Sequence, residues 1–184
     1  ALISIEALKK KLEKAKVDGN LPKIIIPVHF AGQSCDMEEI FILSKKYGFK
    51  IIEDAAHAIG GYYKDYPIGS CRFSDITVFS FHPVKIITTG EGGAALTNNN
   101  DYAKKMKLLR SHGITRNPSE MEGNGNNLWY YEQIDLGFNY RMTDIQAALG
   151  ISQMQRLEEF ITRRIKLAKC YDEALMELPI RWQV

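Results

Sequence analysis

Two short apolar runs separated by one amphipathic segment constrain the fold most strongly. KIIIPVHF (residues 23–30) is β-branched and predicts a buried strand, and KIIEDAA (50–56) predicts a second one. CDMEEIFILSKKYG (35–48) lies between them and predicts a helix, with Asp36 as N-cap and Gly48 as its C-terminal stop. A strand, a helix and a strand in this order favour parallel pairing within an α/β sheet.

The remaining periodic segments extend this pattern. Further strands are predicted over SDITVFSF (74–81) and GGAALTN (92–98), and helices over residues 3–16 and 101–111. The expected fold class is therefore α/β, with a mostly parallel sheet flanked by helices. Residues 113–133 predict a flexible loop because they combine glycine, proline and asparagine, and residues 141–178 predict a long helical region.

Composition narrows the class of function. The chain has 184 residues, of which 45% are apolar, and this is enough for one sizeable core. Its 24 basic and 22 acidic residues leave a net charge of +2, so neither a nucleic-acid nor an acidic-membrane partner is predicted. The apolar runs are far shorter than the roughly 20 residues that span a bilayer.

The cysteines and the two ends of the chain add four expectations. Cys35, Cys71 and Cys170 are widely spaced and match no zinc pattern, so we expect reduced thiols, a cytoplasmic location and no metal. The sequence begins inside a helical pattern and ends on LPIRWQV, which reads as the start of a strand. We therefore expect a fragment of a longer polypeptide.

Polar residues follow the predicted strands at their carboxyl ends. His29, Asp54, His57 and Ser80 all lie at or just past such ends. Ligands of open parallel sheets bind at this edge, so these four residues predict a site.

Lys85 is the most unusual residue near that edge. It lies in FSFHPVKIITTGEGG (79–93), where the nearest charged neighbours are Asp75 and Glu91. Desolvation favours the neutral amine of a lysine, and a neutral amine is what attacks a carbonyl. The alternative is an ordinary lysine whose amine reaches the surface from a loop.

The other three candidates each have more than one interpretation. Asp54 suits a metal ligand, a base, a partner of a cofactor ring nitrogen, or a helix N-cap. His57 suits a ring contact or a structural role, and Ser80 suits a phosphate contact, although serines are common at strand ends. TTGEGG (88–93) lacks both the P-loop and the dinucleotide-binding glycine patterns, which disfavours a nucleotide-binding loop of either kind.

Several motifs in order carry a family resemblance. EDAAHAIGG, SDITVFSFHPVKIITTGEGGAALTNN, LRSHG and LGFNYRMTDIQAALG resemble the DegT/StrS-type sugar aminotransferases, which are fold type I pyridoxal phosphate enzymes. Within that family the motifs are most similar to members that serve pseudaminic acid synthesis. The resemblance implies that residues 1–184 are part of the large, cofactor-binding domain, without its N-terminal segment and without the C-terminal small domain.

The resemblance also implies residue roles. Lys85 matches the lysine that carries pyridoxal 5′-phosphate, and Asp54 the carboxylate facing the pyridine nitrogen. His57 matches the residue beside the ring, and Ser80 a hydroxyl on the phosphate. Asn139 matches an asparagine that reaches the cofactor phosphate of a neighbouring subunit, which implies a homodimer. Related dehydratases carry histidine at the position of Lys85, so lysine favours transamination.

The implied substrates are a UDP-linked 4-keto-6-deoxy sugar and an amino donor, glutamate by analogy. For sugar-nucleotide contact we expect the loop with Arg116, Trp129 and Tyr130, joined by His29. The aromatic residues of this loop suit a dimer interface equally well. Two alternatives remain: an aminotransferase for another 4-keto sugar, of the perosamine or bacillosamine type, and a non-catalytic binding fragment.

Overall fold

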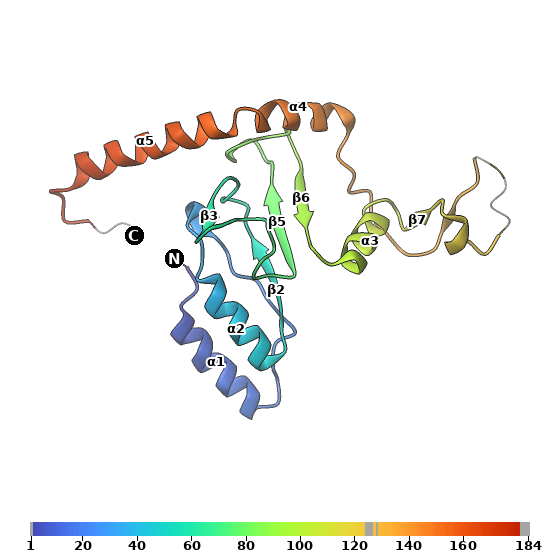
Figure 1. The fold of residues 1–184 in the computed structure, drawn as a ribbon, viewed down its shortest axis with the longest axis horizontal. Coiled ribbons are helices and arrows are strands. Elements are labelled where there is room, and N and C mark those ends of the chain that lie inside the picture. Colours follow the sequence, from blue (N-terminus) through green and yellow to red (C-terminus); the bar gives the residue numbers. More distant parts are fainter. Residues whose placement is uncertain (1, 124–126, 128, 181–184) are drawn as a thin grey trace.

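The computed structural model describes residues 2–123, 127 and 129–180. Three of its strands, β1, β2 and β5, are parallel, and β6 joins them antiparallel in the order β1-β2-β5-β6. This confirms the predicted α/β class with a mostly parallel sheet (Figure 1). The elements are α1 (Ile5–Val17), β1 (Ile24–Ile25), η1 (Phe30–Gly32), α2 (Met37–Tyr47), β2 (Lys50–Asp54), β3 (Tyr62–Tyr63), β4 (Tyr66–Pro67), β5 (Ile76–Ser80), β6 (Gly93–Leu96), α3 (Asn100–Leu109), β7 (Ile114–Thr115), η2 (Pro118–Glu120), β8 (Glu132–Gln133), α4 (Asp144–Met154) and α5 (Leu157–Leu175).

The main core forms where α1 and α2 pack together beside the sheet. Each helix has an apolar stripe, which removes side chains of both helices and of β2 from water. Ser4 caps α1 by accepting a hydrogen bond from the Ala7 backbone N–H at 3.2 Å. The core residues are Leu8, Leu12, Cys35, Met37, Ile40, Leu43, Tyr47, Phe49 and Ile51.

The two ends of α2 differ in how well the sequence predicts them. Gly48 ends the helix in the left-handed region, with φ of 79°, as predicted. Asp36 does not act as a side-chain cap. Its carboxylate instead accepts a hydrogen bond from the Tyr63 hydroxyl at 2.6 Å, which ties α2 to the β3–β4 hairpin.

The first apolar run is less buried than its sequence predicts. Only Ile24 and Ile25 form β1, and Ile26 and Val28 are 56% and 41% exposed. Pro27 has no N–H for a ladder bond, and β1 is an edge strand of the described sheet. The predicted strand over residues 23–30 is therefore confirmed only at residues 24–25, and the prediction that its apolar side chains are buried is wrong for Ile26 and Val28.

The helical region over 141–178 is two helices rather than one. The Thr143 side chain accepts from the Gln146 backbone, and Gln146 bonds back to Thr143, so a capping box starts α4. The break falls at residues 155–156, between α4 and α5. The strand predicted from LPIRWQV extends into residues 181–184, which lie outside the described part of the chain.

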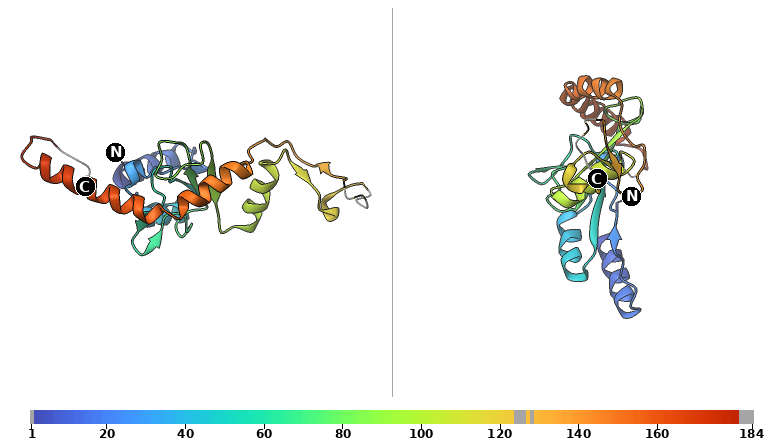
Figure 2. Two further views of the ribbon diagram at one scale, coloured as in Figure 1. Left: turned by 90° about the horizontal axis from the view of Figure 1, so that it is seen from above. Right: turned by 90° about the vertical axis from the view of Figure 1, so that its right-hand side faces the viewer.

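The predicted loop over 113–133 is framed by a short antiparallel pair of β7 and β8. Its residues 124–126 and 128 lie outside the described part. Figures 1 and 2 show this region at one end of an elongated molecule and α5 extending toward the other. Figure 1 also shows α4 and α5 beyond the carboxyl end of β5, the edge at which the predicted site falls. None of the described helices is long and apolar enough to cross a membrane.

Candidate active site

Neighbouring strand ends bring three of the predicted residues to one edge. Asp54 is the last residue of β2 and Ser80 the last of β5, and the parallel register pairs Asp54 with Val78. On the other side the His29 backbone N–H donates to the Asp54 carbonyl at 3.0 Å. Asp54 therefore lies between β5 on one side and the segment that follows β1 on the other.

The Asp54 side chain caps a turn. Oδ1 accepts from the Ala56 backbone N–H at 3.1 Å, and a turn rather than a helix follows. The helix N-cap interpretation of Asp54 is therefore excluded. The carboxylate retains acceptor capacity for a further partner, since each ionised oxygen accepts more than one hydrogen bond.

Lys85 lies on a loop whose base is fixed. Phe81 donates its N–H to the Gly92 carbonyl at 2.8 Å, and its own carbonyl accepts from the Thr89 N–H at 3.0 Å. Within the loop, the Lys85 N–H donates to the His82 carbonyl at 2.9 Å. The backbone position of Lys85 is thus set by hydrogen bonds, while its side chain forms no hydrogen bond or ion pair with the part of the chain that the structure describes.

A cavity of about 790 Å³ brings Lys85 and His57 together. Four parts of the chain form its walls: the η1 turn, the segment between β2 and β3, the loop that carries Lys85, and one face of α5. Asp54 and Ser80 do not line it. The lining residues are Ala31, Gly32, His57, Ala58, Ile59, Gly60, Gly61, Tyr62, Val84, Lys85, Ile86, Glu158, Ile161, Arg164 and Ile165.

His57 is exposed, and its ring is oriented by two contacts. Nδ1 accepts from the Ala31 backbone N–H at 3.3 Å, which leaves the proton of the neutral ring on Nε2. Phe30 meets the ring edge-on, with centroids 6.0 Å apart. The orientation of the imidazole is therefore set before any ligand binds.

His29, predicted to contact substrate, is fully buried. Its Nε2 lies 2.9 Å from Glu53 Oε2, and its Nδ1 lies 3.2 Å from the Cys35 backbone nitrogen. Both ring nitrogens are engaged inside the protein, so the ring is closed to a solute in this structure. His29 therefore stabilises the fold, and its burial contradicts the prediction that it contacts substrate.

Glu53 completes this buried cluster. Its Oε1 accepts from the hydroxyls of Ser74 and Thr77, at 3.1 Å for Thr77. Burial raises the pKa of Glu53, but the hydrogen bonds from His29 and Ser74 outweigh it and the net pKa is lowered. Burial lowers the pKa of His29, and the side chains of Cys35 and Glu53 raise it to about 9.

The predicted substrate residues of the 113–133 loop contact other residues of the same loop. The Arg116 guanidinium lies 5.8 Å from the Tyr131 ring centroid, and the Trp129 and Tyr130 rings meet edge-on at 6.1 Å. The Tyr130 hydroxyl donates to Glu132 at 2.7 Å. None of these residues lines the Lys85 cavity.

Asn139 lies on a different segment, after β8. It is exposed, and it bridges to Ser111 after α3. It too is absent from the lining of the Lys85 cavity.

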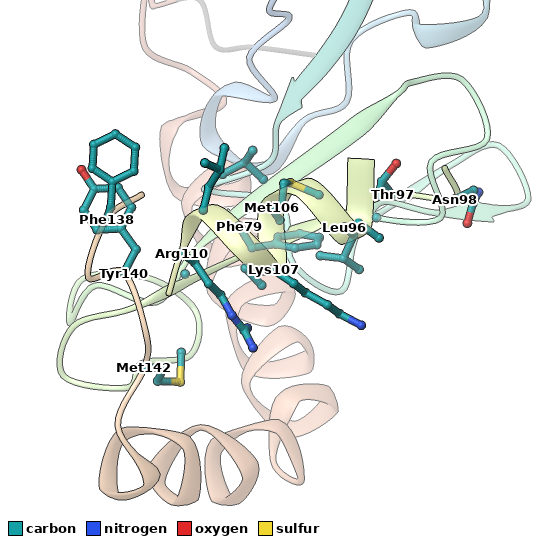
Figure 3. Close-up of a pocket in the computed structure, with 17 residues that line it drawn as sticks. Phe79, Leu96, Thr97, Asn98, Met106, Lys107, Arg110, Phe138, Tyr140 and Met142 are labelled. Carbon is teal, nitrogen blue, oxygen red and sulfur yellow. The ribbon is translucent and has the colours of Figure 1, made fainter. Parts of the chain in front are cut away.

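A second and larger cavity, of about 930 Å³, contains none of the predicted residues. It lies between β5, β6, α3 and residues 138–142, and its floor is apolar. Figure 3 shows Phe79, Leu96 and Met106 at its centre, with Lys107 and Arg110 extending from α3. We place the candidate site at the Lys85 cavity because two of the predicted residues, Lys85 and His57, line it.

Sequence reasoning missed two sets of residues. Glu53 was overlooked because it is adjacent to Asp54, another acidic residue at the same strand end. Only the alternation of side chains along a strand indicates that the two carboxylates point to opposite faces of the sheet. Glu158 and Arg164 lie in a helix whose distance from the site is not readable from its own sequence. The described residues contain no group of three or more His, Cys, Asp or Glu arranged for a metal ion.

Solved aminotransferases share the α/β fold of this chain. Helicobacter pylori PseC, an aminotransferase involved in the biosynthesis of pseudoaminic acid, matches with a TM-score of 0.84 and 34% identity. The match covers 97% of this chain and 43% of that one. The PLP-form of the putative sugar aminotransferase Spr1654 from Streptococcus pneumoniae has a TM-score of 0.76 at 30% identity, over 96% of this chain and 45% of that one.

The DegT/DnrJ/EryC1/StrS aminotransferase family matches residues 1–184, and the chain belongs to this family. It is 42% identical over 173 residues to the UDP-4-amino-4,6-dideoxy-N-acetyl-beta-L-altrosamine transaminase of Campylobacter jejuni. That alignment covers 93% of this chain and 43% of the relative. The chain therefore spans less than half the length of the relatives described here.

Proposed function

We propose that residues 1–184 are the lysine-bearing part of the large domain of a pyridoxal phosphate-dependent sugar aminotransferase. The observation that carries the proposal is the shared cavity of Lys85 and His57, at the sheet edge where Asp54 and Ser80 end their strands. Family membership supports the same class of reaction.

The residues present fit this cofactor. Lys85 supplies an amine on a backbone that hydrogen bonds fix, and its side chain is half-buried. Asp54 supplies a carboxylate for a ring nitrogen, His57 an oriented imidazole beside the ring, and Ser80 a hydroxyl for the phosphate. Pyridoxal phosphate, when bound, supplies an electron sink for carbanion chemistry.

In this proposal Lys85 acts as general base and acid. Its amine takes the proton from the Cα of the amino donor and returns a proton later in the reaction. Asp54 keeps a proton on the ring nitrogen, because a carboxylate beside it favours the charged form. His57 holds the ring in position, and α5 closes one side of the cavity against water.

For substrates we propose glutamate as amino donor and a UDP-linked 4-keto-6-deoxy sugar as acceptor, in amino-sugar synthesis of the pseudaminic acid type. The names of the Campylobacter jejuni relative and of PseC support this choice. Arg116, Trp129 and Tyr130 are the proposed sugar-nucleotide contacts of the loop. The protein acts in the cytoplasm as a homodimer in which Asn139 of one subunit reaches the cofactor phosphate of the other.

The cofactor assignment is tested by absorbance. The protein is mixed with pyridoxal phosphate, reduced with borohydride and digested, and the labelled lysine is identified by mass spectrometry. We expect label at Lys85 and loss of the visible absorbance band in Lys85→Ala, whereas Lys107→Ala keeps both. Label spread over surface lysines, or none in wild type, would contradict the proposal and favour a non-catalytic binding fragment.

The substrate assignment needs a separate assay. Glutamate is supplied with UDP-4-keto-6-deoxy sugars or with a dTDP-linked 4-keto sugar, and amino-sugar formation is followed. We expect preference for a UDP-linked sugar by at least about tenfold, the size of one lost polar contact. Equal turnover of the dTDP-sugar would instead support an aminotransferase of another type.

A further inference from the structure

One face of α5 forms a wall of the Lys85 cavity, although this helix is far from Lys85 in sequence. Glu158, Ile161, Arg164 and Ile165 line the cavity. Ile161, Arg164 and Ile165 follow Glu158 by three, six and seven residues, so the four lie on one side of the helix. The cavity therefore contains two cations, at Lys85 and Arg164, and one carboxylate, at Glu158.

A close contact fixes the position of this wall. A Cβ atom at Gly60 would lie 2.2 Å from Ile161 Cδ1 and 3.4 Å from Leu157 Cδ2. The absence of a side chain at Gly60 leaves room for the Ile161 side chain of α5 in this position, and the φ of +78° at Gly60 independently favours glycine. Because Ile161 packs against Gly60, Arg164, which lies one turn later on α5, is positioned at the cavity.

The Arg164 guanidinium has no anionic partner in the part of the chain that the structure describes. Arg156, which immediately precedes α5, is by contrast paired with Glu159, with Nε 3.2 Å from Oε2. If Lys85 is bonded to a cofactor, as the proposed function requires, Arg164 is the permanent cation left in the cavity lining. A guanidinium matches a carboxylate or a phosphate in a bidentate geometry.

We propose that Arg164 binds an anionic group of a substrate inside the Lys85 cavity. The inference rests on the proposed function, since it takes that cavity as the reaction site. Two sources supply such a group: the carboxylates of the amino donor and the diphosphate of the nucleotide sugar.

Arg163 provides a matched control. It lies one residue away on the same helix and carries the same charge. It lines a different hollow on the helix, which shares only Glu158 with the Lys85 cavity. Arg163→Ala therefore removes the same net charge without changing the lining of the Lys85 cavity.

The test measures binding by isothermal titration calorimetry in cofactor-loaded protein. Glutarate serves as an unreactive dicarboxylate probe and UDP as a diphosphate probe. We expect Arg164→Ala to weaken one of them at least about tenfold, Arg164→Lys to weaken it less, and Arg163→Ala to change it less than about twofold. A loss for glutarate identifies the amino donor as the source, and a loss for UDP identifies the nucleotide.

Unchanged binding of both probes by Arg164→Ala overturns the inference, and so does wild-type protein that binds neither. Equal losses in Arg163→Ala and Arg164→Ala also overturn it, because they indicate long-range charge rather than contact. Failure of the proposed function is distinguishable, since it appears as the absence of a Lys85-dependent absorbance band. Circular dichroism of each variant establishes that it is folded.

Discussion

His29 and Glu53 form a buried ion pair, with Nε2 and Oε2 2.9 Å apart and side chains 0% and 7% exposed. Ser74 and Thr77 satisfy the other carboxylate oxygen, and Cys35 meets the other ring nitrogen. The pair joins the end of β2 to the segment after β1 on the side opposite to Asp54. It therefore holds the strand end that presents the proposed catalytic carboxylate.

Removing one partner of this pair should be costly. Glu53→Ala leaves the His29 ring buried without its acceptor, and we expect a loss of about 3–5 kcal/mol in the free energy of unfolding. Urea denaturation measures it. Glu39→Ala removes an exposed partner of Lys9 and should change stability much less. Similar losses in both variants would show that the buried pair has no special role.

The same pair predicts a pH dependence of stability. The pKa of His29 is raised from 6.5 to about 9, so its contribution is full below pH 6.5 and is lost as the pH rises through 9. The pKa of Glu53 is lowered from 4.5, so its contribution is present above pH 4.5 and is lost as the pH falls below. The stabilisation by the pair should therefore be largest between pH 4.5 and 6.5.

The comparison variant for this pH profile is His29→Gln, which keeps a donor and removes the charge. The difference in unfolding free energy between wild type and His29→Gln should shrink by up to about 3 kcal/mol between pH 6.5 and 9. A difference that stays constant over this range would mean that His29 is neutral throughout, with its Nδ1 accepting from Cys35.

Replacing Gly60 by alanine should cause a steric clash, and its cost can be measured separately from that of backbone strain. Gly19 has a similar φ, +66°, and open space around its Cα, whereas Gly60 faces Ile161. We expect Gly19→Ala to cost about 1 kcal/mol from strain alone, and Gly60→Ala about 1–3 kcal/mol more from overpacking. Thermal unfolding measures both. In an Ile161→Ala background the extra cost of Gly60→Ala should disappear, and its persistence would place the cause elsewhere.

The three thiols should differ in reactivity. Cys35 is 1% and Cys71 8% exposed, and Cys170 is exposed on α5. Ellman's reagent should therefore modify one thiol quickly in native protein and all three in denaturant. Cys170→Ser should abolish the fast phase. Fast modification of two or three thiols in native protein would contradict the packing around Cys35 and Cys71.

The strand and helix pattern of the core was predictable because local periodicity determines it. Strands at β2 and β5, and a helix that Gly48 ends, follow from apolar spacing and glycine placement. The exposure of Ile26 and Val28 was not predictable in the same way. An apolar run looks the same in a covered strand and at a sheet edge, and only the topology distinguishes them.

The candidate site was partly predictable for a related reason. Strand-end positions are readable from sequence, which is why Asp54 and Ser80 lie at one edge of the sheet as expected. The burial of His29 depends on Glu53 meeting it across strands, and the approach of Arg164 depends on how α5 packs on Gly60. Such long-range contacts leave no local signal.

The antiparallel pairing of β6 with β5 has a further consequence for Lys85. Because Ser80 is opposite Gly93, the chain leaves the sheet and returns to it at the same point, and residues 81–92 form a closed loop. A loop whose ends are joined has already lost most of its conformational entropy on folding. The amine can therefore explore little more than the reach of its own side chain, so reaction at this edge needs no further ordering of the backbone.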